Sequence, residues 1–500
     1  MTSSVTSRPA AQEPSEGSPS SGLPLALDRF FGVSQRGSTL GREARGGLTT
    51  FFTMAYIVVL NPLIIGLAPD KNGDTLGLAS VAGVTCLVAA AMTILMGLLG
   101  KMPFGLATGL GLNAFVAVSV ASQMSWAEAM GLVVIEGLII TVLVLTGFRT
   151  AVFRAIPAYL KASIAVGIGM FITLIGLVDG GLVRRIPDAA GTTVPVQLGT
   201  DGTVHGWPLL VFLIGLALIS VLVVRRVKGA ILIGIVATTV VAAIVDRFAS
   251  PGPAFVDGKP NPTGWALNEP ALPDRLLDTP DLHLVGHFSL LGAFTSVGVL
   301  TAILLVFTLV LADFFDVMGT TVALATEANL LDEEGLFPRT GRVLFVDGLA
   351  AMVGGASSAS SATTYVESSA GIAEGARTGL ASVFTGLLFI AALALTPLVS
   401  VVPSEAAGPA LVVVGVLMMA QIRKIDFTDY AVAIPAFLTI AFMPFTYSIT
   451  NGIGIGFVAH TLIRTVQGRA REIHPLMWGV SVVFVLYFGI NVVKSVFGVA

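Results

Sequence analysis

The sequence predicts an all-α polytopic membrane protein, and both the composition and the spacing of apolar runs support this fold class. Of the 500 residues, 55% are hydrophobic and only 11% are charged, and the mean hydropathy is +0.90. Soluble domains carry about 25% charged residues. Apolar runs of roughly 17–25 residues, the length that a helix needs to cross a bilayer, recur along the chain.

The charge balance and the cysteine content exclude several other classes of protein. The 30 acidic and 27 basic residues nearly cancel and give no indication of a nucleic-acid partner. The single cysteine, Cys86, lies inside an apolar run, so neither a disulfide framework nor a cysteine metal site is expected. We therefore expect no cofactor, and a lipid bilayer as the surroundings of the chain.

The apolar runs define the order of elements along the chain. Residues 1–27 are rich in Ser, Pro and Gly and are expected to form a disordered tail, with no signal peptide before the first span. Twelve runs of bilayer length follow, at 48–68, 77–99, 127–147, 156–177, 207–225, 229–246, 291–322, 339–355, 378–398, 404–421, 429–447 and 448–467. Two shorter segments, 109–123 and 364–374, bring the total to fourteen. The last apolar run, 475–493, fits either a fifteenth span or a helix in the membrane plane.

The basic residues predict the orientation of these spans. With the N-terminus in the cytoplasm, twenty of the 27 Lys and Arg residues lie inside and six outside, with Lys494 unassigned. Such an excess follows the positive-inside rule. The loop 247–290 is then outside, and the protein is expected in the cytoplasmic membrane.

An internal repeat links the two halves of the chain. Pro103 precedes Asn113 by ten residues, and Ser357 precedes Glu367 by the same interval. The sequence around residue 234 also resembles that around residue 456. Because each half contains seven segments, an odd number, the two repeats must have inverted topology in the membrane.

Two carboxylates occupy positions where a membrane chain rarely tolerates a charge. Asp316 lies in the apolar run 291–322, and Glu367 lies at the start of the short broken segment 364–374, next to the Gly- and Ser-rich stretch 354–365. An ionised Asp at the bilayer centre costs about 2.5–3.5 kcal/mol, and irregular backbone at this depth must be buried in protein or line a cavity. A discontinuous helix with an acid at its tip is typical of a transporter binding site.

Further polar side chains extend this candidate site. On a helix, Asp313, Asp316 and Thr320 share one face. This face could line a cavity, or Asp313 could bond a neighbouring helix. Asn113, in the other broken segment, offers an amide donor and acceptor to an uncharged ligand or simply caps its helix.

Glu136 and Asp347 are more consistent with bridging spans or with a proton path than with ligand contact. None of the five histidines lies on the acidic face. If protons are coupled to transport, carboxylates carry them, because a buried carboxyl can exchange a proton near neutral pH.

Four motifs resemble the nucleobase–ascorbate transporter family, also called nucleobase:cation symporter 2, and within it the purine permeases of the AzgA-like branch. These motifs are GLTTFFTMAYIVVLNP at 47–62, GLGLNAF at 109–115, DFFDVMGT at 313–320 and TTYVESSAG at 363–371. The resemblance implies a fourteen-span 7+7 inverted repeat with two half-helices, each preceded by a short extended stretch. It also implies import of guanine and hypoxanthine, or of adenine, coupled to H⁺, and a homodimer.

The resemblance also implies a division into domains. A core domain would comprise 28–155 (spans 1–4) and 291–400 (spans 8–11). A gate domain would comprise 156–290 (spans 5–7) and 401–470 (spans 12–14), followed by a C-terminal apolar helix at 471–500.

Carried over residue by residue, the family pattern assigns the base-holding glutamate of span 10 to Glu367 and the acid of span 8 to Asp316. Thr320 stands where uracil permeases have a histidine, which favours a bulkier base and a different proton route. The expected substrate-binding set is completed by Asn113, its neighbour Ala114, and Ser368, which follows Glu367. The expected proton-coupling set consists of Asp316, Glu367 and Asp313.

Two other functions remain open at this point. An anion transporter could share the 7+7 fold, although two acids at the site would repel an anion. An intramembrane aspartyl protease could use Asp316 and Asp347, but no Gly-x-Gly-Asp motif surrounds Asp347 and an enzyme has no need of an inverted repeat. The choice among purines, and between H⁺ and Na⁺, is not made by the sequence.

Overall fold

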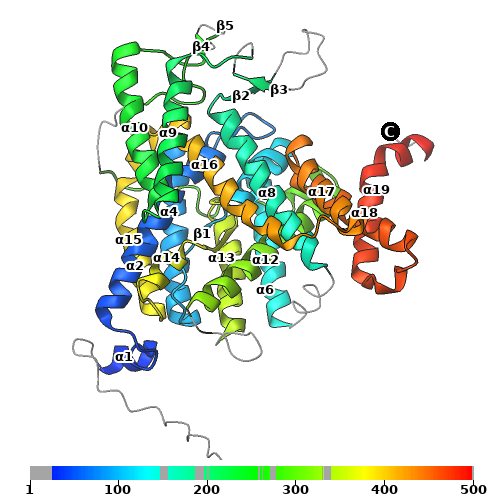
Figure 1. Cartoon of the computed structure of the whole chain (residues 1–500), viewed down its shortest axis with the longest axis horizontal. Coiled ribbons are helices and arrows are strands. Elements are labelled where there is room, and N and C mark those ends of the chain that lie inside the picture. Colours follow the sequence, from blue (N-terminus) through cyan, green and yellow to red (C-terminus); the bar gives the residue numbers. More distant parts are fainter. Residues whose placement is uncertain are drawn as a thin grey trace, which may run out of the picture.

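Every apolar run identified in the sequence is helical in the computed structural model. The structure describes residues 25–146, 156–185, 196–199, 202–256, 259–261, 263–270, 277–328, 330 and 339–497. Within these residues, eight helices are long and apolar enough to cross a membrane. The protein is therefore a mostly helical, multi-pass membrane protein (Figure 1).

The helices of the first half follow the predicted order. They are α1 (Leu25–Phe31), α2 (Leu40–Met54), α3 (Ile57–Asn61), α4 (Leu78–Leu95), α5 (Leu110–Phe115), α6 (Trp126–Leu145), α8 (Ala158–Asp179), α9 (Trp207–Val224) and α10 (Ala230–Ala249). Most of the predicted tail lies outside the described residues, but residues 25–27, which we expected in that tail, begin α1. Span 1 begins with α2 at Leu40, eight residues before the run starting at Leu48, because Thr39 caps the helix through its side chain.

The helices of the second half also match the apolar runs. They are α11 (Gly292–Ser296), α12 (Val299–Glu327), α13 (Thr340–Ala356), α14 (Ser368–Ala373), α15 (Gly379–Ala392), α16 (Ser404–Met419), α17 (Tyr430–Phe445), α18 (Ile449–Val466) and α19 (Pro475–Phe497). Glycine divides the run 291–322 into two helices, since Gly298 between α11 and α12 has a positive φ of 83°.

Three short antiparallel strand pairs complete the fold. β1 (Leu106–Thr108) pairs with β6 (Ala362–Thr364) in the interior, and both strands are buried. β2 (Val183–Arg185) pairs with β3 (Val196–Leu198), and β4 (Phe255–Val256) with β5 (Lys259–Pro260). These last two pairs lie at one end of the molecule, and α1 lies at the opposite end (Figure 1).

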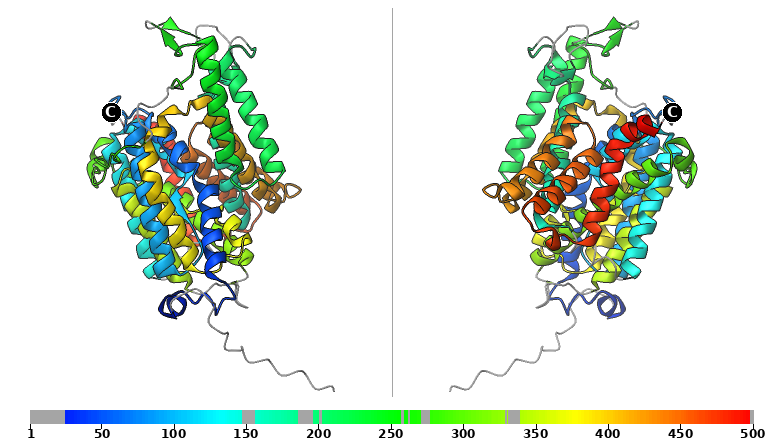
Figure 2. Two further views of the ribbon diagram at one scale, coloured as in Figure 1. Left: turned by 90° about the vertical axis from the view of Figure 1, so that its left-hand side faces the viewer. Right: turned by 90° about the vertical axis from the view of Figure 1, so that its right-hand side faces the viewer.

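The helices pack in two groups. In the first, α2 packs against α14 and α15, α4 against α15, and α6 against α12 and α13. In the second, α8 packs against α16 and α17, α9 against α10 and α16, and α18 against α17 and α19. Figure 2 shows α9 and α10 side by side at one edge of the bundle.

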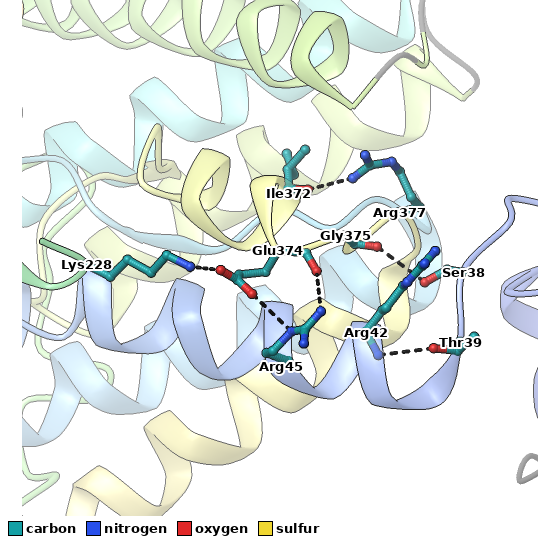
Figure 3. A network of polar contacts seen from close by, with 9 residues as sticks. All are labelled: Ser38, Thr39, Arg42, Arg45, Lys228, Ile372, Glu374, Gly375 and Arg377. Carbon is teal, nitrogen blue, oxygen red and sulfur yellow. Dashed lines mark hydrogen bonds and ion pairs between the residues drawn. The ribbon is translucent and has the colours of Figure 1, made fainter. Parts of the chain in front are cut away.

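An ionic network connects the two groups beside the end of α14. Glu374, which follows α14, accepts from Arg45 of α2, with 3.0 Å between Nε and Oε2. Its other oxygen, Oε1, contacts the ammonium group of Lys228, in the turn between α9 and α10. Figure 3 shows Glu374 between these two cations. Lys228 thus joins the second group of helices to the first.

Candidate functional site

The β1–β6 pair brings the starts of the two half-helices together. Leu106 lies opposite Thr364, and Thr108 lies opposite Ala362. The pairing is extended by a hydrogen bond from the Gly109 N–H to the oxygen of Ser361, 2.9 Å. Helix α5 begins two residues after β1, and α14 begins four residues after β6. The two half-helices therefore start near the same crossing point. The first N–H groups of α14 are bonded to the turn before it, Ser368 to the Tyr365 oxygen at 3.1 Å and Ser369 to the Val366 oxygen at 3.0 Å.

Two buried acids hold this crossing in place. Oδ1 of Asp347 accepts from the Thr364 N–H at 2.9 Å and from the Thr364 hydroxyl at 2.7 Å. Oε1 of Glu136 accepts from the Ser361 hydroxyl at 3.1 Å. Glu136 lies on α6 and Asp347 on α13, so both acids bridge spans, which is one of the two roles that the sequence predicts for them.

Glu367 occupies the N-cap position of α14, as its place in the sequence predicts. Its side chain is half-buried. The hydroxyl of Tyr56 donates to Oε1 at a distance of 2.5 Å. Among the described residues, no other residue donates a hydrogen bond to Oε2, so this oxygen is open to a ligand.

Helix α12 carries three polar residues that differ in their surroundings. Asp313 is fully buried, Thr320 is half-buried, and Asp316 is exposed although it lies in the middle of a 29-residue helix. The helix packs against α5, α14 and β6. The charges of Asp316, Asp347 and Glu367 are close enough to interact. Asp316 is therefore accessible on the surface of α12, whereas Asp313 is enclosed.

Asn113, Ala114 and Ser368 are all buried. The Asn113 amide donates to the Thr108 hydroxyl at 3.2 Å, and its carbonyl oxygen has no partner among the described residues. Ser368 donates to the Tyr365 oxygen at 2.7 Å and accepts from the Gly105 N–H at 2.9 Å. The Ser368 hydroxyl thus joins the residue just before β1 to α14, while Asn113 retains an unused acceptor.

Two tyrosines were not among the residues singled out from the sequence. Tyr56 bonds Glu367, and the Tyr365 hydroxyl donates to the Thr108 oxygen at 2.5 Å. Their ring centroids lie 6.4 Å apart. The sequence did contain a signal for Tyr56, which lies in the apolar run 48–68. A tyrosine hydroxyl buried in such a run usually needs a hydrogen-bond partner.

Two half-helices that meet at a buried strand pair, with Glu367 at the start of one of them, are the arrangement typical of a polytopic membrane transporter. A family model described as "Permease family" matches residues 41–455. The chain belongs to this family, the nucleobase–ascorbate transporters, whose members are permeases and not enzymes.

Curated relatives match the chain over most of its length. It is 39% identical to the guanine/hypoxanthine permease PbuG of Bacillus subtilis, covering 92% of this chain and 99% of the relative. It is 35% identical to the adenine permease AdeP of Escherichia coli, covering 92% of this chain and 95% of the relative.

Solved structures share the fold at low sequence identity. The transmembrane domain of the cyanobacterial bicarbonate transporter BicA aligns with a TM-score of 0.56 and 14% identity, covering 84% of this chain and 97% of that chain. The murine anion transporter Slc26a9, in the inward-facing state, aligns with a TM-score of 0.56 and 12% identity. The alignment covers 91% of this chain and 74% of that chain. These likenesses concern the arrangement of helices alone.

Proposed function

We propose that the protein is a proton-coupled symporter that imports purine nucleobases, guanine and hypoxanthine or adenine, across the cytoplasmic membrane. The observation that carries the proposal is the Glu367 carboxylate, held at the start of α14 with one oxygen free and with Asp316 exposed nearby. The named relatives transport these bases.

The chemistry of the site suits a planar, uncharged heterocycle. A purine carries N–H donors, and the free oxygen of Glu367 is a charge-assisted acceptor worth about 1.5–3 kcal/mol per hydrogen bond. Asn113 supplies a second acceptor from α5. Asp316 and Thr320 are accessible on α12, and we assign Ala114 and Ser368, both buried in the half-helices, to the same site.

We further propose fourteen spans arranged as a 7+7 inverted repeat, with the N-terminus in the cytoplasm. The antiparallel β1–β6 pair supports this arrangement, because elements related by a two-fold axis meet in opposite directions. The two packing groups support a core of 28–155 and 291–400 and a gate of 156–290 and 401–470. Alternating access would result from movement of one group against the other. We also propose that the protein forms a homodimer and uses no cofactor, with H⁺ as the coupling ion.

An anion substrate is the alternative that the fold likeness suggests. The carboxylate of Asp316 is close enough to those of Asp347 and Glu367 to interact with each of them. An anion placed among them would be repelled. The charge of the site therefore favours a neutral base.

The test is uptake of labelled hypoxanthine and adenine in a bacterium lacking its own purine transporters, with the other bases as competitors. Glu367→Gln should abolish uptake while the protein remains in the membrane at normal abundance, because the charged acceptor is lost. Uptake should also increase as the external pH falls and should collapse with a protonophore. Unchanged affinity in Glu367→Gln contradicts the assignment of the site, and uptake that follows external sodium contradicts proton coupling.

A further inference from the structure

Tyr56 is held in place by packing of its ring and by hydrogen bonds of its backbone. It lies between α2 and α3, and its side chain is buried, with 1% of its surface accessible. The backbone on both sides is hydrogen-bonded, since Ala55 donates to Phe51 at 2.7 Å and Val59 donates to Tyr56 at 3.0 Å. Packing of the ring therefore determines where the hydroxyl points.

The same span also reaches the main chain of Glu367. The Thr53 hydroxyl lies 3.2 Å from the Glu367 backbone oxygen, in addition to its contacts with Thr49 and Thr50 in its own helix. The first span thus contacts Glu367 at its backbone, through Thr53, and at its carboxylate, through Tyr56.

A free glutamate side chain has several rotatable bonds, and a ligand that binds it must immobilise them. Ordering a side chain of this kind on binding weakens affinity, and holding it in advance removes that cost. The Tyr56 hydroxyl occupies Oε1 and so fixes the direction of Oε2, the oxygen without a partner among the described residues.

We propose that Tyr56 is a positioning residue that holds the Glu367 carboxylate in the orientation that accepts a purine N–H. This inference rests on the proposed function of Glu367. Tyr56 acts through Glu367 and donates its one hydroxyl proton to Oε1, so it is not itself assigned a bond to the base.

The experiment compares Tyr56→Phe with Tyr159→Phe. Tyr159 is a second buried tyrosine, whose hydroxyl lies 2.6 Å from Nδ1 of His460, away from the crossing. Each change removes one hydroxyl and keeps the ring. Initial rates of hypoxanthine and adenine uptake would be measured over a range of concentrations and normalised to the abundance of the protein in the membrane.

Tyr56→Phe should raise KM by roughly 3–10-fold, with Vmax per molecule unchanged within about twofold, because only preorganisation is lost. Tyr159→Phe should leave KM unchanged. A wild-type KM in Tyr56→Phe, alongside a Glu367→Gln variant without uptake, overturns the proposal and leaves the function of Glu367 intact. Lower Vmax with unchanged KM, or failure to accumulate in the membrane, also overturns it, because both results mark Tyr56 as structural. Wild-type uptake by Glu367→Gln would instead reject the underlying function.

Discussion

At the scale of single residues, two aspartates on one helix differ in how accessible their side chains are. Asp313 and Asp316 are one turn apart on α12, yet Asp313 is fully buried and Asp316 is exposed. An acid that an aqueous space can reach is able to exchange a proton with that space, whereas an enclosed acid cannot do so without movement. Asp316 is therefore the better candidate for linking proton and ligand.

Asp316→Asn should retain purine binding and lose pH-dependent accumulation against a gradient. Asparagine imitates the protonated carboxyl in shape and neutrality but cannot release a proton. Binding would be measured on purified protein, and accumulation in cells at several external pH values. The two activities should separate in this one variant.

Asp246→Asn provides the matched control, because Asp246 bonds Trp265 at 2.8 Å at the far end of α10. It should accumulate purine as the wild type does. If Asp316→Asn concentrates purine with normal pH dependence, the proton travels through another group, and Asp313, Asp347 and Glu136 become the residues to test.

At the scale of elements, the contact between α2 and α14 depends on two glycines. A Cβ at Gly46 would lie 2.5 Å from the Cβ of Ala376 and 2.8 Å from the oxygen of Gly371. A Cβ at Gly371 would lie 2.1 Å from the Thr50 hydroxyl. The half-helix that carries Glu367 therefore lies directly against the backbone of span 1.

Gly46→Ala should destabilise the protein by about 1–3 kcal/mol and reduce purine uptake, because the added methyl group pushes α14 away from α2. Thermal unfolding of the purified protein and uptake per molecule would measure the two effects.

Gly41→Ala is the control in the same helix, since nothing lies within 4 Å of a Cβ there. Alanine should stabilise that position by about 0.5–1 kcal/mol. Equal stability of the two variants would show that the close approach of α2 and α14 is not required.

At the scale of the whole molecule, the Glu374 network connects the two groups of helices (Figure 3). Arg45 and Glu374 belong to the same packing group, whereas Lys228 comes from the other. Glu374 also ends the half-helix that Glu367 begins. A movement between the groups would have to break the contact of Lys228 while keeping that of Arg45.

If the two groups of helices move against each other during transport, Lys228→Gln should change the ratio between the conformation with this contact and the one without it. Vmax should change with that ratio by about 2–5-fold, because an exposed ion pair contributes at most about 1 kcal/mol. Uptake at saturating purine, measured at low and high ionic strength, would detect the change, since salt screens the wild-type pair.

Arg45→Gln removes a cation from the same carboxylate but leaves the link between the groups. It should lower thermal stability slightly and keep Vmax. Identical effects of the two substitutions on Vmax would mean that the contact of Lys228 does not depend on conformation.

The sequence by itself determined which segments are helical and where the acids lie in them. Most apolar runs became helices within a few residues of their expected bounds, for example 77–99 against Leu78–Leu95 and its continuation to Gly100. The exceptions are span 1, which begins eight residues early, and the run 291–322, which Gly298 divides. This follows because a backbone inside a bilayer must satisfy its own hydrogen bonds within the segment. Glu367 at the start of α14 could be predicted for the same reason, since Gly and Ser interrupt the helix just before it.

Only the tertiary structure decided which of these segments meet. Tyr56 and Glu367 are 311 residues apart in the chain, and Asp316 and Asp313 have the same local sequence pattern but opposite exposure. The pairing of β1 with β6, the contacts of Thr53 and Tyr56 with Glu367 and the different exposure of Asp313 and Asp316 all arise from packing between distant segments. Periodicity describes one helix at a time and carries no information about such contacts.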